Sequence, residues 1–343
     1  MKENSKVSII ILNWNGWRDT VECLQSLSKL AYPNYEVVVV DNGSTDDDRE
    51  QLKSQISKLK STTQNLKLIF NNKNLGFAEG NNVAIRQVLK EGRSDFILLL
   101  NNDTVVDKDF LSELVAAAQR DEKIGIVGPK VYYYDYQGRK DVIQTTGSTL
   151  NLFQERRRPP LRFGGDEADT TVRAEGAYKA KQSTTGSARG SLYWGKFPEV
   201  GENPDRAGEV DWVSGACLLI KVAAIEDIGL LDKSYFLFFE DIDWCLRAQR
   251  AGYSIFYTPR AVIWHKKGRS FEQNNVSQVY YYTRNLFWFE FKHADRRQLL
   301  CFLLNYFAFI FPKYFLGYWL VKRDRDLLKS YTRGIRDGIL LKN

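Results

Sequence analysis

Four short runs of apolar residues, rich in branched side chains, recur along the first third of the chain. They are Val7–Leu12, Glu36–Val40, Leu66–Phe70 and Phe96–Leu100. Each run is hydrophobic almost throughout instead of alternating with polar residues, which indicates β-strands covered on both faces. Helical patterns occupy the segments between them, namely Thr20–Leu30, Thr45–Leu59 and Gly80–Lys90. The alternation predicts an α/β fold with a mostly parallel central sheet flanked by helices.

The same pattern continues for two elements and is then interrupted by a polar stretch. A helix is predicted over Phe110–Gln119 and a strand over Ile124–Tyr134. Gln137–Glu209 is rich in Gly and in charged residues, so we expect irregular structure or short strands there. Order returns with Val210–Lys221, followed by a predicted helix at Glu240–Ala251 and a predicted strand at Ser254–Val262.

The last part of the chain has a different pattern, aromatic and helical, and we divide the protein into residues 1–268 and 269–343. Leu299–Val321 is as long as a membrane span, which needs about 20 apolar residues, but Pro312-Lys313 lies near its middle. A charge at that depth is costly. We therefore expect two shorter helices, Leu299–Phe311 and Tyr314–Val321, lying in a membrane interface. The alternative is an apolar hairpin packed on the first domain or across a dimer.

Charge supports contact with anions. Lys and Arg residues outnumber Asp and Glu residues by seven, and the pI is about 9.0, which suits partners that carry phosphate, including an anionic membrane surface. Basic residues flank the apolar segment at Arg296-Arg297, Lys322-Arg323 and Arg325. The four cysteines show no CxxC spacing, so neither a zinc framework nor a disulfide scaffold is indicated. With no signal-peptide pattern at the N-terminus, we expect a cytoplasmic protein.

Polar side chains follow each of the first four predicted strands. They include Asn13, Asp41, Asn74 and the triplet Asn101-Asn102-Asp103. A single such end is explained by a turn, but four at one edge of a parallel sheet predict a crevice where a ligand binds. Asp103 is a hard oxygen ligand suited to Mg²⁺ or Mn²⁺ held together with substrate phosphates. Neither GxGxxG nor GxxxxGK[ST] is present, which disfavours a dinucleotide fold and a P-loop.

An ordered series of motifs resembles family 2 glycosyltransferases of the GT-A fold, in particular a rhamnosyltransferase-like branch that builds surface glycans. The series is VSIIILNWNG, VVVVDNGSTD, NLGFAEGNN, LLLNND, VSGACLLIK, FFEDIDWCLRAQRAG and IWHKKG. The resemblance covers about residues 6–290. It implies transfer of a sugar from a nucleotide-diphosphate donor, dTDP- or UDP-linked, to a polyprenyl-diphosphate-linked or glycan acceptor at the cytoplasmic membrane face. The polar stretch 137–209 would then shape the acceptor side.

The resemblance also assigns residues to the donor and the metal. It implies that Asp41 reads the nucleotide base, that Asn101 contacts the ribose and that Asp103 binds the metal, with Asn101 in place of the first acid of a DxD motif. We expect His265 either to add a metal ligand or to be a hydrogen-bonded residue at the rim. The other residues expected at the donor are Asn13, Asn74, Gly76, Asn81 and Asn102.

The catalytic base is expected in the pair Glu240-Asp241, with Asp241 the first choice and Glu240 the second. The alternative is that these acids only suit the N-terminus of a helix. Asp243 is expected to pair with Arg247. Arg284 could hold a diphosphate of the donor or the acceptor, or be a structural arginine. His293 is expected at the surface.

Two rival functions remain open at this stage. A nucleotidyltransferase would carry a Gly-rich, Arg-containing loop near its N-terminus, which this sequence lacks. A non-catalytic protein that binds nucleotide sugars or glycans would show no turnover of the donor. We expect no nucleic acid partner, because no basic and aromatic module of a known type appears.

Overall fold

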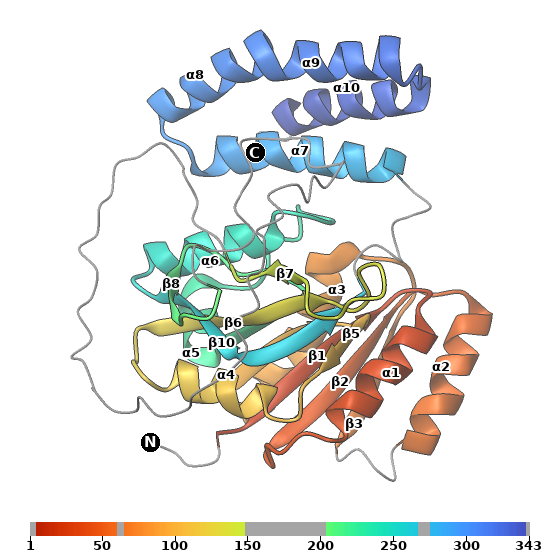
Figure 1. Ribbon diagram of the computed structural model, residues 1–343, viewed down its shortest axis with the longest axis vertical. Helices are drawn as coiled ribbons and strands as arrows, with labels where there is room; N and C mark the ends of the chain where they lie inside the picture. The colour runs from red at the N-terminus through yellow and green to blue at the C-terminus, as the bar shows by residue number, and fades with distance from the viewer. Residues whose placement is uncertain (1–4, 60–64, 148–203, 267–274, 341–343) are drawn as a thin grey trace.

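The computed structural model describes residues 5–59, 65–147, 204–266 and 275–340 of the chain. Figure 1 shows an α/β part built on one large sheet and a stack of helices at the C-terminal end. The predicted domain boundary at 268/269 lies outside the described residues, and so does most of the polar stretch 137–209.

The ten strands within the described residues form one sheet in the order β3-β2-β1-β4-β9-β6-β10-β5, with β7 paired to β6 and β8 to β10. Six strands are parallel to one another, as the apolar runs predicted: β1 (Val7–Asn13), β2 (Tyr35–Asn42), β3 (Leu66–Asn71), β4 (Phe96–Asn101), β6 (Ile124–Tyr133) and β10 (Ser254–His265). The antiparallel strands are β5 (Thr104–Val106), β7 (Ile143–Thr145), β8 (Gly208–Val210) and β9 (Cys217–Lys221).

Helices cover both faces of the sheet, which explains why its strands are hydrophobic throughout. Successive residues of a strand point to opposite faces, so Ile9 joins one core cluster and Ile10 the other. The first face is covered by α1 (Trp17–Leu27), α2 (Asp46–Leu59) and α4 (Phe110–Ala118). The second is covered by α3 (Gly76–Glu91), α5 (Val222–Ile228) and α6 (Glu240–Arg250).

The C-terminal part corrects one prediction. One continuous helix runs from Arg296 to Val321 in place of the two shorter helices expected. It consists of α8 (Arg296–Asn305), a π-helical turn η1 (Tyr306–Ile310), α9 (Phe311–Leu316) and a second π-helical turn η2 (Gly317–Val321). Pro312 does not break the helix because the wider turn η1 directly precedes it, with the N–H of Phe311 donating to the carbonyl of Tyr306.

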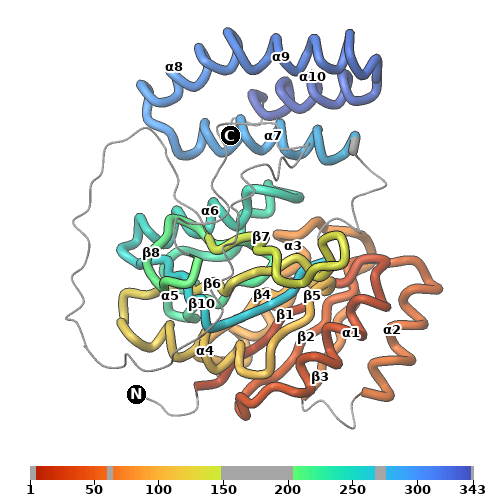
Figure 2. Tube along the Cα trace, in the orientation of Figure 1, coloured from red at the N-terminus to blue at the C-terminus, as the bar shows by residue number. Residues whose placement is uncertain are grey.

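Two further helices, α7 (Asn275–His293) and α10 (Arg325–Leu340), pack beneath the long helix. Figure 2 shows α7 between the α/β part and the two later helices. Phe287, Tyr306 and Tyr331 form the centre of their aromatic core. Gly338 lets α10 approach α7 closely, since a Cβ there would lie 2.5 Å from the carbonyl oxygen of Arg284.

The outer surface of the long helix is apolar. Large side chains that stay exposed on it include Leu300, Leu304, Phe307, Phe309, Leu316, Trp319, Leu320 and Val321. By length and composition alone this helix could cross a membrane. It is an apolar helix with a surface available for membrane association, and its core-facing side chains are already used in packing on α7 and α10.

Candidate functional site

The polar ends of the parallel strands meet at one edge of the sheet, as predicted. Asn13 is in register with Asp41, and Asn42 is in register with Asn71. Asn101 pairs with Leu12 on the other side of β1. The four strand ends therefore form a continuous row of amide and carboxylate groups at the edge where open α/β sheets bind ligands.

Asn13 connects β1 to the loop after β2. Its amide nitrogen lies 3.1 Å from Asp41 Oδ1 and 3.0 Å from Asp48 Oδ2, and its carbonyl oxygen accepts from the Thr20 hydroxyl at 2.9 Å. Asp41 Oδ2 pairs with Arg49 Nε at 3.1 Å. Both Asn13 and Asp41 are fully buried, so direct reading of a base by Asp41 requires its neighbours to rearrange. The sequence motif did not indicate Arg49 as its ion-pair partner.

Asn74 and Gly76 form a tight turn against the end of β2. Asn74 Oδ1 accepts from the Asn42 amide at 3.0 Å and from the Gly76 N–H at 2.8 Å. Gly76 has φ +79°, and a Cβ there would lie 2.4 Å from the carbonyl oxygen of Phe236. Only glycine fits this position without strain. The predicted residue Asn81 is buried one turn further along α3, where its amide donates to the Phe77 carbonyl at 2.9 Å.

The triplet after β4 lies beside His265, the last residue of β10. His265 Nε2 is 3.1 Å from Asp103 Oδ1 and 3.4 Å from the Asn101 amide. Asn102 points the other way and donates to Thr20 Oγ1 at 3.1 Å. Burial alone would raise the pKa of Asp103, but the hydrogen bond and charge of His265 outweigh it, and this pKa lies below its usual value. Asp103 is thus held as an anion.

The pair Asp103 and His265 fits a divalent metal that keeps most of its other ligands from the substrate. Adjacent ligand atoms of an octahedral ion at about 2.1 Å lie roughly 3.0 Å apart, close to the 3.1 Å between Oδ1 and Nε2. Gln144 on β7 orients the imidazole from behind, with its side-chain oxygen 3.2 Å from His265 Nδ1. Within the described residues no group of three or more His, Cys, Asp or Glu side chains forms a complete metal cage.

Glu240 and Asp241 begin α6, next to the β4 edge. Asp241 Oδ2 accepts from the Gly215 N–H and Oδ1 from the Ile242 N–H, both at 2.8 Å. Burial raises the pKa of Asp241, although these two hydrogen bonds oppose the shift. Burial and the neighbouring charge of Asp241 raise the pKa of Glu240 well above its usual value. Oε2 of Glu240 is buried without a hydrogen-bond partner among the described residues, which also favours the neutral acid.

A strained turn precedes this pair. Phe238 has φ +70° and Phe239 has φ +74°, values that large side chains rarely adopt. Each costs on the order of 1–3 kcal/mol, and such strain gathers at functional sites. Asn285 of α7 holds the turn, because its amide donates to the carbonyls of Leu237 and Phe238 at 2.7 and 2.9 Å. Arg284 adds a bond from Nη2 to the Ser234 carbonyl at 2.7 Å.

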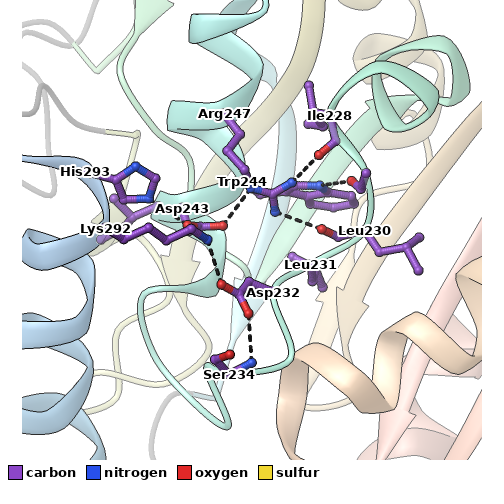
Figure 3. A network of polar contacts seen from close by, with 12 residues as sticks. Ile228, Leu230, Leu231, Asp232, Ser234, Asp243, Trp244, Arg247, Lys292 and His293 are labelled. Carbon is purple, nitrogen blue, oxygen red and sulfur yellow. Dashed lines mark hydrogen bonds and ion pairs between the residues drawn. The ribbon is translucent and has the colours of Figure 1, made fainter. Parts of the chain in front are cut away.

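The fully buried carboxylate of Asp243 fastens α6 to α7 (Figure 3). Its Oδ2 accepts from Arg247 Nε at 2.8 Å, which confirms the predicted pair. Its Oδ1 accepts from Lys292 Nζ at 2.6 Å and His293 Nε2 at 2.7 Å. The expectation of a surface His293 was wrong, because its side chain fills the α6–α7 contact and leaves only 3% exposed. These partners lower the pKa of Asp243 to about 2 against the effect of burial.

Comparison with known proteins shows the family of the chain. A family model described as glycosyltransferase like family 2 matches residues 4–278. The protein y4gI of Sinorhizobium fredii is 30% identical over 275 residues, which are 79% of this chain and 25% of that protein. The N-acetylglucosaminyl-diphospho-decaprenol L-rhamnosyltransferase of Mycobacterium tuberculosis is 26% identical, covering 75% of this chain and 74% of the relative. Agl10, a glycan biosynthesis hexosyltransferase of Haloferax volcanii, is 25% identical, covering 73% and 63%.

Solved structures share the fold. The mannosyltransferase PcManGT of Pyrobaculum calidifontis, in complex with GDP-Man and Mn²⁺, superposes with a TM-score of 0.53 at 14% identity, covering all of this chain and 77% of that one. TarS of Staphylococcus aureus with UDP-GlcNAc superposes with a TM-score of 0.52 at 18% identity, covering 97% and 80%. The family model matches most of the length of this chain, and the solved glycosyltransferase structures superpose on it. The chain therefore belongs to glycosyltransferase family 2 and has a GT-A fold.

Proposed function

We propose that this protein is an inverting glycosyltransferase. It moves a sugar from a dTDP- or UDP-linked donor to a hydroxyl of a polyprenyl-diphosphate-linked or glycan acceptor, in the synthesis of a surface glycan. The observation that carries the proposal is the Asp241 carboxylate, fixed by two backbone N–H groups beside the edge that holds Asp103 and His265. The rhamnosyltransferase and hexosyltransferase relatives support the reaction class.

Asp241 acts as the general base in this proposal. An acceptor hydroxyl must lose its proton as it attacks the anomeric carbon, and a positioned carboxylate with a raised pKa accepts that proton well. Glu240 stays neutral beside it, so the two adjacent acids do not both carry charge. Because one carboxylate removes the proton in a single displacement, the configuration at the anomeric carbon inverts.

Asp103 and His265 would hold Mg²⁺ or Mn²⁺ on the donor side. The metal, when bound, neutralises the charge that develops on the departing diphosphate. Asn101 next to them would contact the donor ribose. Buried Asn13, Asp41, Gly76 and Asn81, with half-buried Asn74, would shape the floor for the nucleotide. Asn101 replaces a carboxylate, so fewer protein charges face the metal than in a DxD site.

The protein is further proposed to work at the cytoplasmic face of the membrane as a peripheral enzyme. The exposed apolar surface of the helix 296–321 supports this, together with the basic residues at both of its ends. Aromatic and apolar side chains would enter the interface, and the cations would contact anionic head groups. A polyprenyl-linked acceptor would be reached at the same surface.

One experiment separates this function from a non-catalytic sugar-nucleotide binder. Purified protein is incubated with UDP-, dTDP- and GDP-sugars, with and without Mn²⁺, and the release of nucleoside diphosphate is measured for wild type and Asp241→Asn. We expect metal-dependent release with one donor, reduced in the variant. Thermal stabilisation by a donor without any turnover, even after acceptor lipids are added, would instead identify a binding protein.

A further inference from the structure

An open hollow of about 310 Å³ lies between α7 and α10. It is lined by Tyr280, Arg284, Asp337 and Leu340. The two helices approach closely on one side of it, where Gly334 and Gly338 pack on the α7 backbone. The hollow combines a cation, two polar groups and an apolar rim, which is the composition expected of a ligand site that orients an amphiphile.

Arg284 is fixed in place with part of its guanidinium unused. Nε donates to Asn285 Oδ1 at 2.8 Å and Nη2 to the Ser234 carbonyl at 2.7 Å. The group also lies over the rings of Tyr280 and Tyr281, 5.8 and 5.1 Å from their centroids. These are all the contacts found for it within the described residues, so Nη1 remains available. A pre-oriented guanidinium edge is well suited to phosphate oxygens.

The charge around the hollow is positive. The guanidinium of Arg333 also lies over the Tyr280 ring, 5.1 Å from its centroid. Arg333 pairs with Asp337 at 3.4 Å. Arg336 pairs with the same carboxylate at 2.7 Å. Arg284 lines the same hollow without pairing with Asp337, so three guanidinium groups and one carboxylate leave an excess of two positive charges around it. That excess matches an anion with more than one phosphate.

The hollow is also connected to the catalytic pair. Tyr281, next to the hollow, stacks on Phe236 with ring centroids 4.8 Å apart. The carbonyl of Phe236 accepts from the N–H of Phe77 at 2.7 Å, at the start of α3. Arg284 bonds the same loop that leads through the strained turn to Glu240 and Asp241. Arg284 is therefore linked through this loop to the segment that carries the proposed base.

We propose that this hollow binds the diphosphate of an isoprenoid-linked acceptor, with Arg284 and Arg333 contacting the phosphates and Leu340 contacting the first isoprene unit. The assignment rests on the proposed transferase function and names its acceptor subsite. Leu340 is 70% exposed at the rim and is available for such a contact. The donor's diphosphate has the same chemistry, so the test must distinguish the two sources.

Binding of farnesyl diphosphate to the full-length protein tests the proposal, measured by titration calorimetry with UDP and Mn²⁺ already saturating. We expect binding that UDP does not compete with, at least tenfold weaker for farnesyl phosphate and lost for farnesol. Arg284→Gln should weaken farnesyl diphosphate binding at least tenfold and leave UDP binding unchanged. Lys329→Gln, which removes an exposed cation elsewhere on α10, should change neither.

A second pair of variants covers the case in which Arg284→Gln disturbs the loop it holds. Leu340→Glu adds a carboxylate to the rim and Leu340→Gln a neutral group of the same shape, at an exposed site at the end of α10. Both variants lose the apolar contact of Leu340, and the glutamate variant should bind farnesyl diphosphate more weakly than the glutamine variant, because its charge repels the diphosphate. Displacement of farnesyl diphosphate by UDP, or equal affinity in the two Leu340 variants, would overturn the proposal. Donor hydrolysis that depends on Asp241 would persist in that case and leave the transferase function intact.

Discussion

The carboxylate of Asp241 accepts a hydrogen bond from the backbone N–H of Gly215 at 2.8 Å. The next residue, Ala216, accepts from the N–H of Asn101 at 2.9 Å. Two consecutive residues of the segment before β9 therefore connect the proposed base to the end of β4, two residues before the proposed metal ligand Asp103. Backbone contacts thus fix the spacing between the proposed base and the proposed metal site, as a site that holds reacting groups in productive geometry requires.

Asp241→Asn should lower turnover by about two to four orders of magnitude, because an amide cannot accept the proton. It also places an NH₂ group against one of two backbone donors, so we expect a stability loss of about 1–3 kcal/mol. Steady-state kinetics and urea unfolding give the two effects separately, and donor affinity should stay near normal.

Glu240→Gln is the matched control for that variant. Glu240 is buried and held neutral by burial and by the charge of Asp241, so a neutral amide of the same shape should retain most of the turnover. In the wild type the raised pKa of Asp241 should move the acid limb of the kcat/KM profile above that of an ordinary aspartate. A crippled Glu240→Gln beside an active Asp241→Asn would exchange the two assignments.

Asp103→Ala should abolish transfer and the Mn²⁺-dependent part of UDP binding, while the fold survives. Asp109→Ala removes an exposed acid six residues away and serves as the control. Gln144→Leu should weaken Mn²⁺ affinity by about 10–100-fold, because outer partners orient a histidine ligand and Gln144 contacts His265 Nδ1. Titration calorimetry with Mn²⁺ and UDP measures the binding of both ligands in the two variants. Full activity of Asp103→Ala, or of wild type in excess EDTA, would refute the metal role.

Part of the candidate site could be predicted from the sequence, because the local pattern of apolar and polar residues determines it. Parallel strands share a register, so polar residues directly after apolar runs must meet at one edge, as Asn13 and Asp41 do. Other parts depend on long-range contacts. Gln144 lies in a polar stretch without periodicity, and it reaches His265 across 121 positions. The two Phe residues before Glu240 look like ordinary core residues, and only their φ angles reveal the turn.

The two errors also have physical causes. His293 stands among charged residues and reads as surface, yet the buried Asp243 needs hydrogen-bond donors and recruits it from α7. Pro312 normally interrupts a helix, and the π-helical turn before it removes the conflict. Neither the donor for a distant carboxylate nor the width of a helical turn is encoded in the local pattern.

Asn285→Ala should lower kcat at least tenfold with little change in KM for the donor. The reason is that the strained turn at Phe238 and Phe239 would relax once its two hydrogen bonds are lost, and Asp241 would move with it. If Asn285 had a purely structural role, the substitution would lower the melting temperature without lowering kcat selectively over KM. Thr283→Ala, a substitution at a neighbouring buried position of α7, is the control for general loosening.

Acid should destabilise the protein in two steps. Arg250 donates to His293 Nδ1, so His293 is neutral and donates from Nε2 to Asp243. Burial lowers the pKa of His293, and the charges of Arg250 and Lys292 add to this against the effect of Asp243. The unfolded chain therefore binds protons more readily at both groups, and stability falls as pH decreases.

The first step should begin near pH 6.5, the ordinary pKa of histidine, and belongs to His293. The second, below about pH 4, belongs to Asp243, whose pKa is about 2. Urea unfolding at pH 7.5 and 5.5 measures the first step. His293→Gln keeps a donor to Asp243 but does not titrate, so its stability should differ less between the two pH values than that of wild type. If the free energy of unfolding of His293→Gln differs between the two pH values as much as that of wild type, His293 is not the source of the first step.

The long helix yields a prediction about membranes. Phe309 and Trp319 are 70% and 57% exposed on it, and burying each large side chain is worth about 1.5 kcal/mol or more. The double variant Phe309→Ser, Trp319→Ser should bind anionic vesicles on the order of 100-fold more weakly and keep donor hydrolysis, since neither side chain belongs to the aromatic core. Removing the whole segment would be a poorer test, because Phe302 and Tyr306 pack on Phe287.

The basic ends of the helix should contribute a salt-dependent part of the same binding. Charge reversal at Arg297 and Arg323 should weaken the free energy of vesicle binding by about 1 kcal/mol per lost cation. This loss should appear with anionic vesicles and not with neutral ones. High salt should release wild type in part, and detergent should release it fully, because the apolar contact is not screened. Sedimentation with vesicles measures the binding, and sedimentation without them measures the oligomeric state. The membrane proposal is refuted if wild type does not bind vesicles at low salt and forms a dimer that the Phe309, Trp319 double variant does not form.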